Sequence, residues 1–230
     1  MGAGALADTT IVFDLDGTLV DSAPDLVRAL NETLDLEGLP RVSVDRVRTM
    51  IGQGGRVLIE RASALAGAQF SSERLDELLH SFTEFYRSDI AGQTKPFPGA
   101  EAALDVLAGE GAKLCVCTNK RTALSVQLLD ALGLTFRFAA IVGADGVPNK
   151  KPHPDHYRAA VERAGGMVER SLMVGDTAAD VAAAKSAGAP VALVRFGYAD
   201  GDIERLGADA IIDRYAELPS LCSQLLSARS

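Results

Sequence analysis

Five residues near the start of the chain, Asp14-Leu15-Asp16-Gly17-Thr18, combine side chains that could do chemistry together. Two carboxylates placed two residues apart in an extended strand point to the same side, and a glycine after them allows a sharp turn. One carboxylate could act as a nucleophile, and the other could protonate a leaving group and then deprotonate water. The same letters are also compatible with an ordinary Asp-Gly turn.

Three further polar clusters follow along the chain: Thr118-Asn119, Lys150-Lys151-Pro152-His153-Pro154 and Gly175-Asp176-Thr177-Ala178-Ala179-Asp180. In the first, a hydroxyl and the free N–H groups of a helix start could bind an anion, or the pair could simply cap a helix. In the second, a lysine near Asp14 would neutralise a phosphate, although a solvated loop fits equally. In the third, two carboxylates one helical turn apart could bind Mg²⁺, or could cap a helix.

The segments that position these clusters alternate between apolar runs and amphipathic stretches. We expect strands within residues 7–16, 112–118, 138–144, 171–176, 190–197 and 208–214, and helices within 123–133, 156–166, 178–188 and 218–228. Strands that alternate with helices predict an α/β fold with a doubly wound, mostly parallel sheet. Ligands bind at the carboxyl ends of such strands, which is where all four clusters fall.

Residues 18–92 differ from the rest because they show helical spacing without an intervening β-branched run, in segments 23–38, 43–67 and 71–86. The chain then returns through residues 91–100, which are rich in glycine and proline and fit a hinge. We therefore expect an α/β core made of residues 1–17 and 93–230, and an inserted all-helical cap made of residues 18–92.

The four aspartates of the first and last clusters, Asp14, Asp16, Asp176 and Asp180, would lie in one small space under this arrangement. Unpaired carboxylates so close together repel one another strongly. A divalent cation and the ammonium of Lys151 would relieve that repulsion. We therefore expect Mg²⁺ as the cofactor.

The clusters, in this order, resemble the four signature motifs of the haloacid dehalogenase superfamily, and the helical insert is similar to its C1 cap. Residues 20–26, 51–54, 97–99 and 195–198 are further similar to the phosphoglycolate phosphatases, although Gln53 stands where an asparagine is expected. The second acid, Asp16, favours phosphoryl transfer over dehalogenation, because a departing halide needs no proton.

The resemblance implies a role for each matching residue. Asp14 would be the nucleophile and a metal ligand, Asp16 the acid and base with its backbone carbonyl on Mg²⁺, and Asp176 a further metal ligand. Catalytic contacts to the phosphoryl oxygens would come from Thr118 and Lys151. Supporting or phosphate-binding roles would fall to three residues, namely Asn119, Thr177 and Asp180.

The expected activity is Mg²⁺-dependent hydrolysis of a small phosphorylated metabolite, 2-phosphoglycolate, through an aspartyl-phosphate on Asp14. The alternatives are a mutase resembling β-phosphoglucomutase, a pyrophosphate or nucleotide phosphatase and, more distantly, a non-catalytic binding module. In the cap, Gly52 and Arg56 are the candidates for substrate contact. Arg56 could grip a substrate carboxylate with both guanidinium nitrogens, or could be a solvated helix residue.

The composition and charge of the chain limit which binding partners are expected. The 230 residues include 31 acidic and 23 basic ones, giving a net charge of −8, so a nucleic-acid partner is not expected. No apolar run is long enough for a membrane span, and the start of the chain lacks the features of a secretory signal. Three cysteines without framework spacing are typical of a reducing cytoplasm. His153 and His156 are expected at the surface, and Phe82 and Tyr86 in the core of the insert.

Overall fold

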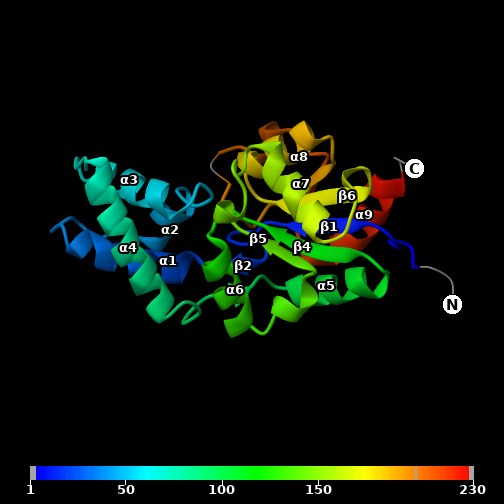
Figure 1. The fold of residues 1–230 in the computed structure, drawn as a ribbon, viewed down its shortest axis with the longest axis horizontal. Coiled ribbons are helices and arrows are strands. Elements are labelled where there is room, and N and C mark those ends of the chain that lie inside the picture. The colour runs from blue at the N-terminus through cyan, green and yellow to red at the C-terminus, as the bar shows by residue number, and fades with distance from the viewer. Residues whose placement is uncertain (1–3, 200, 228–230) are drawn as a thin grey trace.

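A six-stranded sheet forms the centre of the computed structural model, which describes residues 4–199 and 201–227 (Figure 1). The strand order is β5-β4-β1-β6-β7-β8, and every neighbouring pair is parallel. The strand bounds are β1 Thr10–Phe13, β4 Lys113–Cys117, β5 Ala140–Val142, β6 Ser171–Gly175, β7 Val191–Val194 and β8 Ala210–Ile212. The doubly wound parallel sheet predicted from the alternating pattern is confirmed.

The register of the three central strands aligns their carboxyl ends. Phe13 of β1 lies opposite Val116 of β4 and Val174 of β6. The residues that leave these strands therefore emerge side by side at one edge. Because the chain continues outward from β1 through β4 on one side and through β6 on the other, β1 lies at the point where the strand order reverses.

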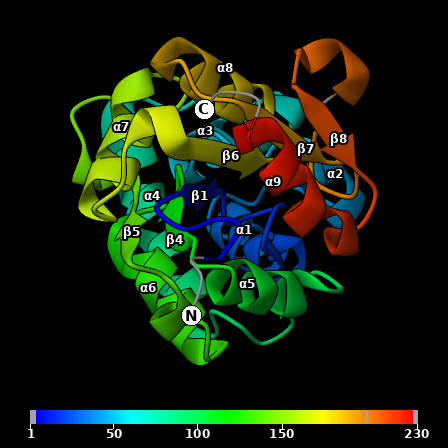
Figure 2. The ribbon, with the colours of Figure 1, turned by 90° about the vertical axis from the view of Figure 1, so that its right-hand side faces the viewer.

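Helices cover both faces of the sheet (Figure 2). On one face lie α5 (Ala100–Gly109) and α9 (Leu218–Ser227), and on the other lie α7 (Pro154–Arg163) and α8 (Ala178–Ala187), while α6 (Thr122–Ala131) packs beside β5. Alternate strand residues face opposite layers, so Phe13 packs with the first pair of helices and Val12 with the second. Both layers are apolar, as expected for strands buried on two faces.

The helical insert forms a separate group of helices between residues 23 and 88, beyond one end of the core (Figure 1), and the range 18–92 that was expected to be all-helical also contains a short strand at residues 20–21. Its helices are α1 Ala23–Asp35, α2 Val44–Arg48, α3 Gly55–Leu65 and α4 Ser72–Ser88. Helix α4 packs against α1 and α3, and its buried stripe follows helical spacing through Leu75, Leu78 and Phe82. Ser43 and Ser71 begin α2 and α4 by accepting a hydrogen bond from a backbone N–H three residues later.

Two chain crossings join the insert to the core, and they run next to each other. β2 (Val20–Asp21) pairs antiparallel with β3 (Lys95–Pro96). Beside this ribbon, the buried carboxylate of Asp25 accepts hydrogen bonds from the backbone N–H groups of Gln93 and Thr94 and from the Thr94 hydroxyl. The glycine- and proline-rich return segment is thus tied to the first turn of α1.

No helix of the described part of the chain, residues 4–199 and 201–227, has both the length and the apolar character to cross a membrane.

Candidate active site

The candidate site lies at the carboxyl edge of the three central strands. Asp14 follows β1, Thr118 follows β4, and Asp176 follows β6. Gly17 turns the first of these loops with φ of +85°, and a Cβ there would lie 2.3 Å from a carboxylate oxygen of Asp176. The turn therefore needs a residue without a side chain for two reasons, its left-handed backbone and the close approach of that carboxylate.

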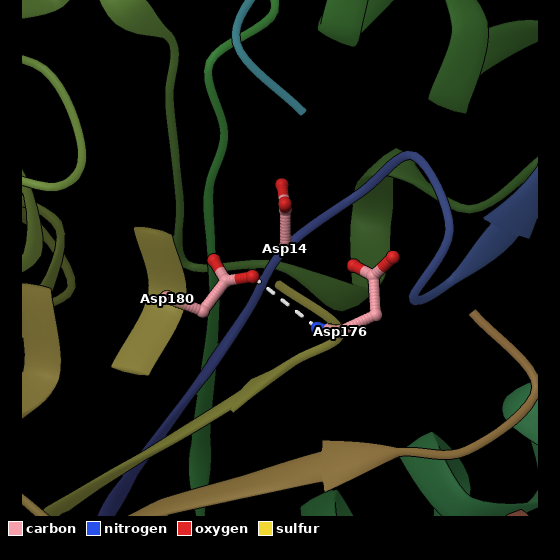
Figure 3. A group of neighbouring side chains, drawn as sticks. All are labelled: Asp14, Asp176 and Asp180. Carbon is pink, nitrogen blue, oxygen red and sulfur yellow. Dashed lines mark hydrogen bonds between the residues drawn. The ribbon is translucent and has the colours of Figure 1, made fainter. Parts of the chain in front are cut away.

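Three carboxylates converge at this edge (Figure 3). One oxygen from each of Asp14, Asp176 and Asp180 lies within 4.8 Å of the others, and all three residues are buried. Thr18 donates its hydroxyl to one oxygen of Asp176 at 2.7 Å, and the Tyr198 backbone N–H donates to the other at 2.7 Å. These contacts fix the direction of the Asp176 carboxylate toward the shared space.

Lys151 supplies the positive charge within the group. Its Nζ lies 3.0 Å from Asp14 Oδ2 and 2.6 Å from Asp180 Oδ1, and its side chain is 1% exposed. Lys150, in contrast, is exposed and donates to the backbone carbonyl of Gln53 in the insert. The structure thus places Lys151, and not Lys150, beside Asp14, as the resemblance to the family motifs implied.

The charges of the group do not balance. Burial raises the pKa of Asp14 to about 6, while Lys151 opposes the shift and Asp180 adds to it. Burial, followed by repulsion from Asp180 and Asp14, raises the pKa of Asp176 well above its usual value. Three buried carboxylates and one ammonium would together carry a net negative charge, which a further cation would offset. A small number of hard oxygen donors suits Mg²⁺. The residues present therefore fit such an ion.

Asp180 already uses both of its oxygens. Oδ1 accepts from Lys151, and Oδ2 accepts from the backbone N–H groups of Asp176 and Thr177 and from the Thr177 hydroxyl at 2.7 Å. Thr177 in turn precedes the first residue of α8. The two residues therefore hold Lys151 and the start of α8 in place, which fits a supporting role behind Asp14 and Asp176.

Asp16 lies apart from the three converging carboxylates. Its oxygens accept from the Ser22 hydroxyl at 2.5 Å and from Lys120 Nζ at 2.8 Å each. The side chain is 12% exposed and borders the cavity described below. Lys120 was not predicted from the sequence, where it looks like a solvated lysine next to Thr118-Asn119.

The expectation that Thr118 and Asn119 begin a helix is wrong. Helix α6 starts four residues later, at Thr122, whose backbone N–H is occupied by Asp145 at 2.8 Å. The chain bends at Asn119 and Lys120, and Arg121, which is extended with φ of −66° and ψ of 144°, directly precedes the helix. Thr118 is buried in the loop, and its hydroxyl accepts from the Lys120 backbone N–H.

Asn119 joins three parts of the site. Its amide nitrogen donates to the carbonyl of Gly52 in the insert at 2.9 Å and to the carbonyl of Lys151 at 3.1 Å. Among the described residues, its buried Oδ1 has no hydrogen-bond partner. One side chain therefore links the insert, the loop after β4 and the lysine loop.

His156 is buried, which corrects the expectation that it lies at the surface. Its Nδ1 accepts from the Lys151 backbone N–H at 3.1 Å, and its Nε2 lies 3.0 Å from the Val142 carbonyl. This pattern requires the neutral ring with its proton on Nε2. Burial lowers the pKa of His156 to about 4. His153, at the start of the same helix, is exposed as predicted.

A cavity of about 80 Å³ lies between the core edge and the insert. Asp14, Asp16, Thr118 and Asn119 border it from the core, and Gly52 borders it from the insert. The insert also contributes apolar walls from three helices, namely Leu26 of α1, Leu58 of α3, and Leu79, Phe82 and Tyr86 of α4.

Arg56 does not border this cavity, so the structure gives no support to its predicted contact with substrate. Its guanidinium pairs with Asp76, lies 3.4 Å from Glu60 and donates to the Ser72 hydroxyl. Tyr86, expected only as insert core, does border the cavity. Helical spacing identified the buried face of α4, but it did not show which side chains on that face border the cavity.

The fold and the converging residues define a hydrolase of the haloacid dehalogenase type. The family model for haloacid dehalogenase-like hydrolases matches residues 9–188, and the chain belongs to this family. It is an enzyme of the phosphatase type within it.

Individual relatives cover nearly the whole chain. It is 48% identical to a phosphoglycolate phosphatase of Caulobacter vibrioides over 97% of this chain and 94% of that protein. It is 44% identical to a phosphoglycolate phosphatase of Agrobacterium fabrum over 94% of this chain and 93% of that protein. A solved structure described as a predicted phosphoglycolate phosphatase from Haemophilus somnus aligns with a TM-score of 0.86 at 31% identity, covering 94% of this chain and 98% of the other.

Proposed function

We propose that this enzyme is a Mg²⁺-dependent phosphomonoester hydrolase whose substrate is 2-phosphoglycolate. The observation that carries the proposal is the meeting of Asp14 with Lys151 and two further buried carboxylates beside a cavity that Asp16 also borders. The substrate is supported by the similarity to two proteins named phosphoglycolate phosphatase. A cavity of about 80 Å³ also favours a small leaving group over a nucleotide.

Asp14 is the proposed nucleophile. Its carboxylate attacks phosphorus, the bond from phosphorus to the ester oxygen breaks, and an aspartyl-phosphate forms. Asp16 gives a proton to the departing alcohol and then takes one from the water that cleaves the aspartyl-phosphate. Lys151 and Thr118 hold the phosphoryl oxygens while charge develops on them.

Mg²⁺ would be held by the carboxylates of Asp14 and Asp176 and by the backbone carbonyl of Asp16. The ion would supply positive charge opposite the phosphoryl oxygens and would neutralise the carboxylates that surround it. Asp180 would stay outside the ligand set, since its oxygens already accept from four donors that hold Lys151 and the start of α8, whereas the oxygens of Asp176 accept from two.

Residues 18–92 would act as a cap over the site. The structure has the insert in contact with the core, because Asn119 binds Gly52 and Lys150 binds Gln53. Opening would break these two polar contacts, admit substrate and release product, and closure would exclude bulk water from the aspartyl-phosphate.

The nucleophile is tested by Asp14→Asn. We expect phosphate release from 2-phosphoglycolate, measured with Mg²⁺ and no bisphosphate activator, to fall by about a thousandfold or more. Asp130→Asn, an exposed change on α6, is the matched control and should leave the rate unchanged. Near-normal release by Asp14→Asn would refute the covalent route. Release that requires a bisphosphate activator would indicate a mutase instead.

A further inference from the structure

Lys120 is a second buried cation at the site, and the proposed reaction does not use it. Its side chain is 5% exposed, its Nζ lies 2.8 Å from both oxygens of Asp16, and it sits 4.6 Å from the centre of the Tyr86 ring. An ammonium has three N–H donors. Two can serve Asp16, and the third can reach either the neighbouring Tyr86 hydroxyl or an acceptor bound in the cavity.

Tyr86 also borders the cavity, and its hydroxyl is a buried polar group. The residue is fully buried, and its hydroxyl makes no hydrogen bond of ordinary geometry with the described residues. Burying a hydroxyl without a partner is unfavourable, and buried tyrosines usually find one. The ring stacks on Phe82 at a centroid distance of 6.2 Å, which holds the hydroxyl in place. A bound ligand with an acceptor group would satisfy it.

Apart from Thr83, whose hydroxyl donates to the Leu79 carbonyl, the other side chains of the insert that border the cavity are apolar, so a charged group there has few other partners. Leu58 and Leu79 face the space from α3 and α4. Arg121 also borders the cavity, but its side chain is 65% exposed and lies 3.5 Å from Asp145. Asn119 already donates to two carbonyls and Thr118 is assigned to the phosphoryl group, so Lys120 and Tyr86 are the buried donors at this cavity that the proposed reaction leaves unassigned.

We propose that Lys120 and Tyr86 form a subsite that binds the negatively charged end of the leaving group. The substrates would be short phosphate esters of hydroxy acids, with the phosphate at Asp14 and the carboxylate between the Lys120 ammonium and the Tyr86 hydroxyl. This inference rests on the proposed function and identifies how the enzyme selects its alcohol. It also replaces Arg56 as the carboxylate-binding residue.

Three esters of similar size but different charge test the subsite: 2-phosphoglycolate, ethyl phosphate and phosphoethanolamine. We expect kcat/KM to fall in that order for the unaltered enzyme. Lys120→Gln should reduce the ratio of kcat/KM for 2-phosphoglycolate over ethyl phosphate by about ten- to a hundredfold, the range for a hydrogen bond to a charged group. Tyr86→Phe, which keeps the ring, should reduce the ratio by about tenfold.

Arg121→Gln is the matched control, because it removes a cation from the exposed rim of the same cavity, and we expect the ratio to stay unchanged. An equal loss for both esters in Lys120→Gln would mean that the lysine acts only through Asp16, and would overturn the subsite. A loss of the ratio in Arg121→Gln alone would overturn it as well.

Equilibrium binding separates this inference from the proposed reaction. Calorimetry on the Asp14→Asn variant should show tighter binding of 2-phosphoglycolate than of ethyl phosphate, and adding Lys120→Gln should remove that preference. This result would support the subsite even if the unaltered enzyme released no phosphate from 2-phosphoglycolate, which would refute the proposed function alone. Equal binding of both esters by the Asp14→Asn variant would overturn the subsite.

Discussion

Buried side chains at the site are held by neighbours from distant parts of the chain. Lys151 joins Asp14 to Asp180, and Lys120 joins the loop after β4 to Asp16. Each lysine sits between groups whose charge it offsets, so its pKa is raised well above the usual value despite burial. These ammonium groups therefore stay charged, and their positions decide how an anionic substrate lies.

His156 gives a prediction about stability and pH. Its pKa is about 4 in the folded protein and 6.5 without the fold, so the unfolded chain binds more protons between these values. The contribution of His156 to the unfolding free energy is therefore full above pH 6.5 and is lost progressively as the pH drops toward 4. Over that window, in EDTA, the unfolding free energy should fall about 1.4 kcal/mol per pH unit more steeply than in His156→Gln. Urea unfolding at several pH values measures this, and parallel curves would contradict it.

The sequence predicted Asp14 and Asp176 as neighbours because each directly follows a strand of the alternating pattern, and the family resemblance added Lys151 to them. Lys120 escaped notice because its partner Asp16 is 104 residues away, and the pairing depends on side-chain direction within a loop. Arg56 was assigned to the cavity because its loop lies there. Which face of α3 carries it depends on packing against α4, where Asp76 captures it.

At the scale of elements, the insert rests on the core through a short loop and a two-stranded ribbon. The loop around Gly52 and Gln53 contacts Asn119 and Lys150, and the ribbon pairs β2 with β3. Hydrogen bonds of this kind contribute about 1 kcal/mol each. The loop contacts can therefore break during turnover while the ribbon keeps the insert attached.

Asp25 anchors this attachment. Asp25→Ala removes the acceptor for two backbone N–H groups and the Thr94 hydroxyl, so the unfolding free energy should fall by about 3 kcal/mol. Urea unfolding measures the loss. Asp35→Ala, an exposed change at the end of the same helix, is the matched control and should cost less. Equal stability of the two variants would show that the return segment does not depend on Asp25.

For the whole molecule, the net charge of −8 opposes binding of an anion. Two buried lysines supply positive charge locally at the site, and the proposed Mg²⁺ would add to it. The alternating pattern predicted the sheet, and helical spacing without β-branched runs predicted the helices of the insert. It could not predict how the insert's side chains fill the cavity, because that depends on the packing of helices from separate segments.

Binding of Mg²⁺ should stabilise the folded enzyme. At a concentration of one hundred times its Kd, the ion should add about 2.7 kcal/mol, which corresponds to about 5 to 10 °C in Tm for a chain of this size. Thermal unfolding with MgCl₂ against EDTA, at matched ionic strength, measures the shift. Asp176→Asn should remove most of it, whereas Asp130→Asn should retain it. A full shift in Asp176→Asn would place the ion elsewhere.

The pairing of β2 with β3 has a consequence for how such enzymes diversify. Asp21 and Lys95 lie directly opposite each other, so the two ends of the insert leave the core about one strand spacing apart, roughly 5 Å. A different segment of almost any length could be inserted between these positions without changing the strand order of the sheet. The insert, which carries Tyr86 of the proposed subsite, can therefore be exchanged while Lys120 and the catalytic edge stay with the core, and a chimaera carrying a foreign insert between residues 21 and 95 should keep an intact core.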